Sequence, residues 1–259
     1  MKRTIALLMA LCMLLALCAC GGSTEAPAQD PAPAQDAAPA QDAAPAAEEP
    51  VQATEEPAAE EPAAEEPAAE EPAEEVSAEE ALGEKTASSY SSTLLGIRYD
   101  APEGWYVLTD EETAQMMGYM ADNTSSEALA DALRNSGSAC DMYAMAQDGS
   151  GETINIQLED LGVLYGITLS EERYLELAKP QLEAALGQMG LQDVSLESGT
   201  LVFAGGEHAC LRIHGTVNGT ELYELMVLIK SGNYMATITA AAMQDGRVDE
   251  ILSSFSALN

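Results

Sequence analysis

His208–Met243 reads HACLRIHGTVNGTELYELMVLIKSGNYMATITAAAM. Three strand-like runs, 208–217, 220–230 and 234–243, follow one another with short breaks. Asn218-Gly219 fills the first break, and Asn-Gly between two such runs is a strong signal for a type I′ hairpin. The middle run is apolar on both faces over most of its length, which is typical of a central strand covered on both sides. The stretch therefore predicts a three-stranded antiparallel meander at the centre of a sheet.

The sequence before this meander adds further strands and several helices. Asp148-Gly149-Ser150-Gly151 is a hairpin signal between strands expected at 139–147 and 152–160. In 152–160 apolar residues alternate with polar ones, so we expect the polar face to be wet. Further strands are expected near residues 93–100, 105–109, 194–197 and 201–204, and helices at 110–121, behind the capping boxes at 124–127 and 168–171, and at 247–258. Hairpins dominate, which predicts an α+β fold with a mainly antiparallel sheet flanked by helices.

Two stretches carry a resemblance to a known family. They are LGIRYDAPEGW at 95–105 and GNYMATITAAAMQDGRVDEILSSFSAL at 232–258. Together with the meander they resemble the PsbP-like/Mog-type α/β/α sandwich. That fold occurs in photosystem oxygen-evolving-complex subunits, in a nuclear-import factor and in many bacterial lipoproteins. The resemblance covers nearly all of residues 90–259 and includes no catalytic motif. It implies a fold and a binding role, and no functional residue is carried over.

The N-terminal residues 1–20 are typical of a lipoprotein signal peptide. Lys2 and Arg3 precede a short apolar run that ends in LALCACGGS. Lipoprotein maturation requires a small residue before the lipid-modified cysteine and favours leucine three positions before it. Cys20 satisfies both conditions, whereas Cys18 follows the bulky Leu17. We therefore expect Cys20 to be the acylated new N-terminus. A membrane-spanning anchor is the alternative, and the shortness of the apolar run disfavours it.

Residues 21–89 are predicted to be a disordered linker, and residues 90–259 a globular domain. The linker repeats QDAAPA and then EEPAA, and it holds 19 acidic side chains against Lys85 alone. Proline at every fifth residue stops helix propagation, and the uniform charge keeps such a chain extended. We interpret it as a spacer or as a tolerated linker of no fixed length. The domain has the size of a single folding unit.

Charge excludes several classes of partner. The chain of 259 residues has 44 acidic and 10 basic side chains, a net charge of −34. This argues against a nucleic-acid footprint and against electrostatic attraction to anionic lipids. The sequence has no phosphate-binding glycine loop, no Gly-x-Ser-x-Gly and no His-Glu-x-x-His. We therefore expect no cofactor and no enzymatic activity.

Two cysteines and a histidine remain as weak site candidates. His208 and Cys210 are two residues apart and share one face of a predicted strand, so they could supply two metal ligands or a thiol with its base. No further ligand and no orienting group are visible, which favours ordinary polar residues on a sheet face. Cys140 and Cys210 lie about 70 residues apart, and the sequence leaves open whether they form a disulfide.

The sequence thus predicts a protein on the extracytoplasmic face of the cell membrane, anchored through lipid on Cys20. Its domain would be a PsbP-like binding or assembly module for a protein or small-molecule partner. The alternative is an envelope metal-binding protein or enzyme that uses the strand face of His208 and Cys210.

Overall fold

The computed structural model describes residues 76–118 and 126–258. The predicted signal peptide, the predicted lipid acceptor Cys20 and residues 21–75 of the predicted linker lie outside this part of the chain. In chain order the described elements are α2 (Ala78–Ala81), β1 (Glu84–Thr86), β2 (Ser89–Ser92), β3 (Ile97–Asp100), β4 (Trp105–Val107), α3 (Asp110–Met116), α4 (Ser126–Ser136), β5 (Ser138–Ala146), β6 (Thr153–Asp160), α5 (Gly162–Thr168), α6 (Glu171–Gln188), β7 (Gln192–Phe203), β8 (Gly206–Val217), β9 (Thr220–Ser231), β10 (Tyr234–Ala242), α7 (Arg247–Leu252) and β11 (Phe255–Ala257).

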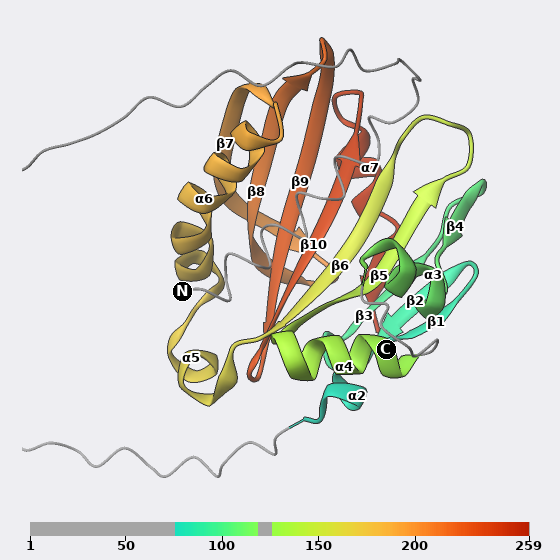
Figure 1. Cartoon of the computed structure of the whole chain (residues 1–259), viewed down its shortest axis with the longest axis vertical. Helices are drawn as coiled ribbons and strands as arrows, with labels where there is room; N and C mark the ends of the chain where they lie inside the picture. The colour runs from blue at the N-terminus through green and yellow to red at the C-terminus, as the bar shows by residue number, and fades with distance from the viewer. Residues whose placement is uncertain (1–75, 119–125, 259) are drawn as a thin grey trace, which may run out of the picture. The chain divides into compact units, whose positions relative to one another are not determined.

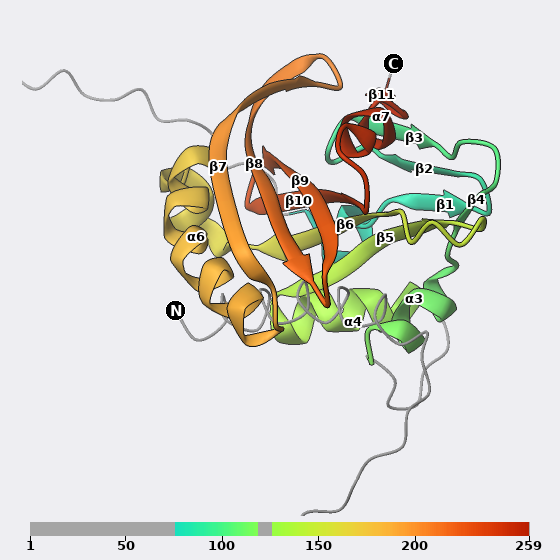
Figure 2. The same cartoon turned by 90° about the horizontal axis from the view of Figure 1, so that it is seen from above.

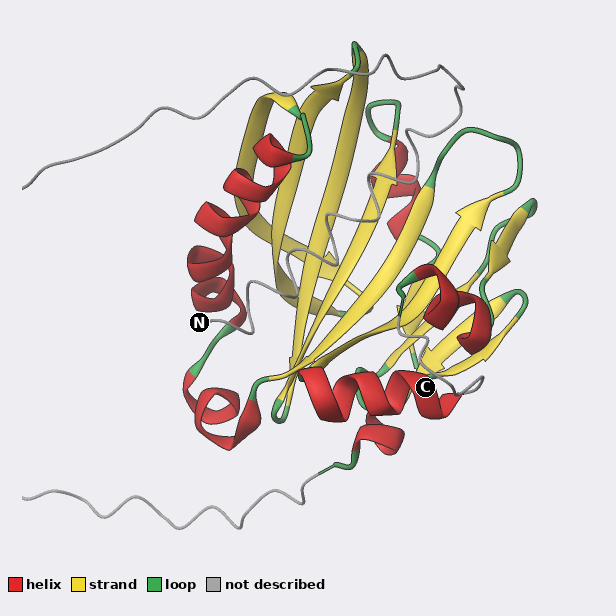
Figure 3. Ribbon diagram, in the orientation of Figure 1, coloured by secondary structure: helices red, strands yellow, loops and turns green. Residues whose placement is uncertain are grey.

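The strands form two antiparallel sheets (Figures 1 and 3). The large sheet has the order β4-β5-β6-β10-β9-β8-β7, and the small sheet has the order β1-β2-β3-β11. Every neighbouring pair in both sheets is antiparallel. The predicted α+β class with a mainly antiparallel sheet is confirmed.

The meander at the C-terminal end is confirmed as strands β8, β9 and β10. Asn218 and Gly219 both have positive φ, 52° and 78°, as the type I′ turn requires. β9 lies between β10 and β8, and its side chains join two cores, one on each face of the sheet. Burial on both faces explains the nearly continuous apolar sequence of this strand.

Different elements cover the two faces of the large sheet (Figure 2). α3 and α6 pack on one face, and α4 lies against β5 with Leu133 in the core of the other face. The small sheet packs on the other, where Tyr90, Tyr99 and Phe255 share a core with Ile156 of β6, and α7 joins them. The second face is therefore covered by the small sheet together with residues of α2, α4 and α7.

The folded domain begins earlier than the predicted boundary at residue 90. α2, β1 and the start of β2 lie within the segment assigned to the linker. The short strand β1 pairs with β2, and Ala81 of α2 is fully buried. These elements are too short to show a periodic pattern, and the acidic composition around them hides them. They form because the rest of the small sheet is present to pair with.

Two further boundaries differ from the expectation. The strands expected at 194–197 and 201–204 are one continuous strand, β7, paired along β8. The helix expected at 247–258 ends at Leu252, and Phe255–Ala257 pairs with β3 instead. Phe255 is apolar at a helical spacing from Leu252, so the sequence pattern alone does not separate helix from strand at this point.

The polar face of β6 is buried, and the expectation of a wet face is wrong. Thr153, Asn155 and Gln157 all lie in the interior, on the side of the sheet that carries the helices. The side chains of β6 do alternate between the two faces, but a buried polar face has the same sequence pattern as an exposed one. This face is the starting point for the functional site.

Candidate functional site

A layer of buried polar side chains crosses three central strands of the large sheet on its helix-covered face. We call it the polar layer and define it as Thr153, Asn155 and Gln157 of β6, Thr237 and Thr239 of β10, and Glu224 of β9.

Strand register aligns the polar layer in cross-strand rows. Asn155 lies opposite Thr239, Gln157 lies opposite Thr237, and Ala241 separates Thr153 from Glu224. Directly opposed side chains of an antiparallel pair have Cβ atoms about 5 Å apart. From Thr153 to Gln157 the layer extends for about 14 Å along the strands. It is a continuous hydrogen-bonding surface rather than a set of scattered polar residues.

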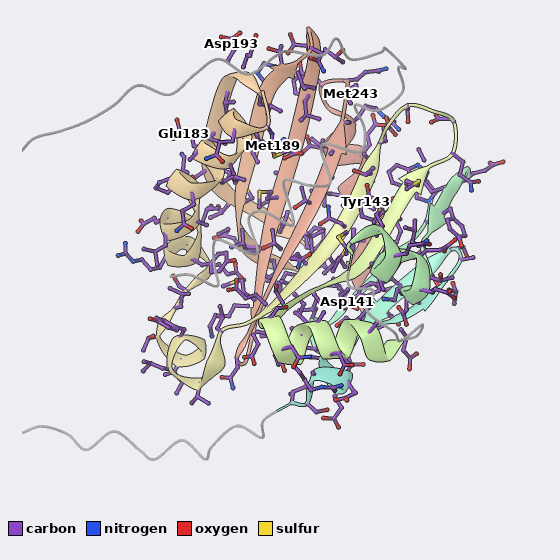
Figure 4. All side chains as sticks on the ribbon, viewed as in Figure 1. Asp141, Tyr143, Glu183, Met189, Asp193 and Met243 are labelled. Carbon is purple, nitrogen blue, oxygen red and sulfur yellow. The ribbon has the colours of Figure 1, made fainter. Side chains whose placement is uncertain are left out.

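Apolar side chains border the polar layer on both sides. On one side α6 packs over β7, β8 and β9 and contributes Tyr174, Leu182 and Leu186 to a core with Leu211 and Met226. On the other side, Leu108 and Tyr143 form a cluster against which methionines of α3 and β5 pack. Figure 4 labels Tyr143 on β5 and Met243 just after β10. The polar layer therefore lies between two apolar clusters on this face of the sheet.

Three atoms of the polar layer are shut off from solvent without a hydrogen bond. They are Asn155 Oδ1, Gln157 Nε2 and Thr239 Oγ1, and none has a hydrogen-bond partner within the part of the chain that the structure describes. A buried polar atom left unsatisfied costs about 1–3 kcal/mol, so such atoms are uncommon in folded proteins. Three such atoms lie together in the polar layer, on the neighbouring strands β6 and β10.

Glu224 places an ionisable group at the edge of the same layer. Its side chain is 5% exposed, and its carboxylate has no hydrogen-bond or ion-pair partner among the described residues. Burial alone raises the pKa of Glu224 to about 7. Near neutral pH the group therefore exists in both protonation states, and as a neutral acid it can donate as well as accept a hydrogen bond.

A second polar cluster lies on the opposite side of the large sheet and has a structural role. A bulge in β5 between Cys140 and Met142 turns Asp141 toward the small sheet. Asp141 is fully buried and accepts hydrogen bonds from Tyr90 Oη at 2.6 Å and from Gly83 N at 3.0 Å. Lys85 Nζ lies 3.7 Å from Asp141 Oδ1 and 2.5 Å from Asp110 Oδ1. Burial raises the pKa of Asp141, and Lys85 opposes that shift.

The structure does not combine His208 and Cys210 into one site. Cys210 is buried in the core between the two sheets, and burial raises the pKa of its thiol. His208 Nδ1 lies 3.0 Å from Glu171 Oε1, at the start of α6. No group of three or more His, Cys, Asp or Glu side chains is arranged to hold a metal ion in residues 76–118 and 126–258. No observation favours the alternative of a metal site or an enzyme on this strand face.

Glu171 has a structural function that explains the position of His208. The pairing of β8 with β9 ends at Cys210 and Val227. Beyond that point the Glu171 carboxylate accepts hydrogen bonds from Ala209 N at 3.0 Å and from Lys230 N at 2.9 Å. The carboxylate therefore joins the separated ends of two strands to the N-terminus of α6.

Replacing Glu171 with alanine is expected to destabilise the domain by about 2 kcal/mol, because two backbone N–H groups lose a charged acceptor. Glu172→Ala, at the exposed neighbouring position of the same helix, is expected to have little effect. Urea unfolding followed by circular dichroism measures both. Equal stability of the two variants would show that water replaces the Glu171 carboxylate.

The open question of a Cys140–Cys210 disulfide is answered by strand order. Cys140 lies on β5 and Cys210 on β8, with β6, β10 and β9 between them. Four strand spacings amount to about 19 Å, far beyond the 7 Å at which two Cα atoms can be bridged. The two cysteines do not bond to each other. Burial also raises the pKa of the Cys140 thiol to about 12.

The described helices contain no segment long and apolar enough to cross a membrane.

Comparison with known proteins gives structural matches only. No family model and no curated protein matches the sequence. One similar structure is a crystal structure from Bacteroides thetaiotaomicron VPI-5482, with a TM-score of 0.38 and 11% identity over 66% of this chain. The present chain spans about half, 48%, of that protein. Another is LpqN, involved in cell envelope biogenesis of Mycobacterium tuberculosis, with a TM-score of 0.35 and 12% identity over 62% of this chain and 82% of its own.

Proposed function

We propose that this protein is an extracytoplasmic lipoprotein whose domain binds an uncharged, hydrogen-bonding ligand on the polar layer. Lipid on Cys20 holds the chain on the cell membrane. The acidic residues 21–75 link that anchor to the domain, and the domain acts as a binding module without enzymatic activity.

The unsatisfied atoms of the polar layer are the observation that carries the binding role. Asn155 Oδ1 accepts hydrogen bonds, Gln157 Nε2 donates them, and the Thr239 hydroxyl does both. A ligand that satisfies all three must present donors and acceptors within about 7 Å along the strands. Amide and hydroxyl groups meet this requirement. The net charge of −34 disfavours an anionic ligand.

Thr239→Val tests whether the polar layer serves the fold or a ligand. The change keeps the shape of the side chain and removes an unsatisfied hydroxyl, so we expect a gain of about 1–2 kcal/mol and a rise in Tm of roughly 3–6 °C. Thr237→Val, on the same face of the same strand, removes a hydroxyl that is not one of the orphaned atoms, and a smaller change is expected. Differential scanning calorimetry measures both. A fall in Tm for Thr239→Val would mean that the hydroxyl stabilises the fold and needs no ligand.

The anchor is tested by the mass of the mature protein. Lipidation at Cys20 adds acyl chains to a chain that starts at residue 20, and two chains hold it durably in a bilayer. We expect Cys20→Ala to lose the added mass and Cys18→Ala to keep it, by intact-mass spectrometry of envelope fractions. A lipidated Cys20→Ala protein would contradict the assignment.

The finer assignment, a PsbP-like domain, is also our proposal. It is supported by the strand entry Pro102-Glu103-Gly104-Trp105 and by the meander β8–β9–β10. An experimental structure that superposes on PsbP-like proteins over both features tests it. Superposition on the meander alone would contradict it.

A further inference from the structure

Helix α5 presents large apolar side chains to solvent at one end of the domain. Val163, Leu164, Tyr165 and Ile167 are 53%, 71%, 59% and 78% exposed. Residues 161–170 contain no charged side chain, in a chain that is otherwise densely acidic. Single exposed apolar residues need no explanation, but four on one seven-residue helix form a patch that marks an interaction surface.

Contacts with the turn between β9 and β10 fix the orientation of α5. Gly166, its one buried residue, packs against the turn between β9 and β10. A Cβ atom at Gly166 would lie 2.4 Å from Asn233 Oδ1 and 2.8 Å from Asn233 Cα, so only glycine fits. Leu161 N donates a hydrogen bond to Asn233 O at 2.8 Å. The apolar side chains therefore point outward because the opposite side of the helix is fixed to the sheet.

The chain from the lipid anchor enters the domain at the same end. Val76, the first described residue, accepts a hydrogen bond through its carbonyl oxygen from Tyr234 Oη at 3.0 Å. Tyr234 pairs with Asp160, two residues before α5 begins. Figure 1 shows α2, α5 and the turn between β9 and β10 together at one end of the domain. The point of attachment and the apolar helix thus face the same side.

We propose that α5 docks on the surface of the bilayer that holds the lipid of Cys20. This inference rests on the proposed lipoprotein function. Val163, Leu164 and Ile167 would enter the acyl boundary, and Tyr165 would lie at the headgroup level, where amphipathic aromatic rings are favoured. The acidic charge of the rest of the domain is repelled by anionic lipid, so the uncharged helix is the surface suited to contact a zwitterionic bilayer.

A second copy of the chain is a less suitable occupant. A stable protein interface buries about 800 Å² per partner, which exceeds what four side chains of one short helix expose. Two copies would also repel each other through their net negative charge. A membrane needs no comparable area, because the anchor already keeps the domain near the bilayer.

The test attaches the chain that starts at Cys20 to phosphatidylcholine vesicles through a maleimide lipid. Cys140 and Cys210 are buried, which leaves the Cys20 thiol as the reactive group. Tyr165→Trp places a fluorophore on α5, and brominated acyl chains quench tryptophan that enters the boundary. We expect quenching of about twofold for this variant and little for the parent chain, which carries Trp105 alone.

Two added changes assign the contact to the apolar helix. Leu164→Asp with Ile167→Asp, in the Tyr165→Trp chain, is expected to abolish quenching. Val202→Asp, which changes an apolar side chain of β7 that is 74% exposed, is expected to leave it unchanged. Absence of quenching in the attached Tyr165→Trp chain would overturn the proposal. So would a dimer of the unattached chain that Leu164→Asp dissociates. Because the attachment is chemical, these results do not depend on whether the cell acylates Cys20, which the mass measurement decides separately.

Discussion

Lys85→Met is expected to destabilise the domain by about 3–5 kcal/mol, the usual effect of leaving a buried charge without its partner. The Lys85 side chain is 7% exposed, and Asp141, with which it pairs, is fully buried. The pair joins the first strand of the small sheet to the bulge of β5, so its loss removes both an ion pair and a contact between sheets. Urea unfolding at pH 8 measures the effect.

The destabilisation by Lys85→Met should shrink as the pH falls. Burial raises the pKa of Asp141 above its ordinary value of 3.8, and removing the cation raises it further. Such a carboxyl has a higher pKa in the folded state than in the unfolded state. Below the unfolded-state pKa it is neutral in both states and does not lower the stability of the fold. As the pH rises through the folded-state pKa, that stability is lost. The loss at pH 5 is therefore expected to be smaller than at pH 8.

Arg98→Met is the matched control for Lys85→Met. Arg98 pairs with Asp100 on the small sheet, but both side chains are about half exposed. Exposed ion pairs contribute little, so we expect a change below about 1 kcal/mol. If Lys85→Met cost no more than Arg98→Met, the interior placement of the Lys85–Asp141 pair would be wrong.

Glu224→Gln is expected to stabilise the domain by about 3 kcal/mol at pH 8.5 and by little at pH 4.5. The pKa of Glu224 is raised from 4.5 to about 7, and each unit corresponds to about 1.4 kcal/mol. The wild-type chain therefore loses stability as the pH rises from 4.5 through 7, whereas glutamine does not ionise. Chemical unfolding across this pH range measures the difference between the two chains.

Glu207→Gln, at an exposed position of β8, is the control for Glu224→Gln, and we expect it to leave the stability nearly unchanged. A loss of stability in Glu224→Gln at every pH would show that the carboxylate has a partner. A gain that grows between pH 4.5 and 7 and then stays constant would show that the chain keeps a buried carboxyl at a cost to its own fold. Residues that lower the stability of the fold in this way are typical of binding sites.

The parts of the fold that could be predicted from the sequence are those set by local interactions. The meander follows from Asn218-Gly219 and from the apolar sequence of 220–230, because turn chemistry and burial both act locally. The early start of the domain was not predictable, since β1 and β2 have no pattern of their own. They depend on partners distant in sequence, such as Lys85 with Asp141. The end of α7 is decided by the pairing of Phe255 with Tyr99, which no local signal reveals.

The candidate site was only partly visible in the sequence. The alternation in β6 marked Asn155 and Gln157 as one face, but alternation does not tell a wet face from a buried one. Glu224 inside an otherwise apolar strand was the signal that could have identified the layer, since an isolated carboxyl in a central strand is costly. Helix α5 at Gly162–Thr168 was not predicted, because its sequence GVLYGIT has neither a capping residue nor an amphipathic period.

The claim that the polar layer holds an uncharged ligand is tested most directly by native mass spectrometry of the protein released from its own envelope in mild detergent. We predict one bound small molecule per wild-type chain. The paired substitution Asn155→Leu with Thr239→Val, which removes two opposed unsatisfied groups, is predicted to give the bare mass under the same conditions. The account would be contradicted if neither the wild-type chain nor the variant carried a bound molecule. It would also be contradicted if both carried the same molecule.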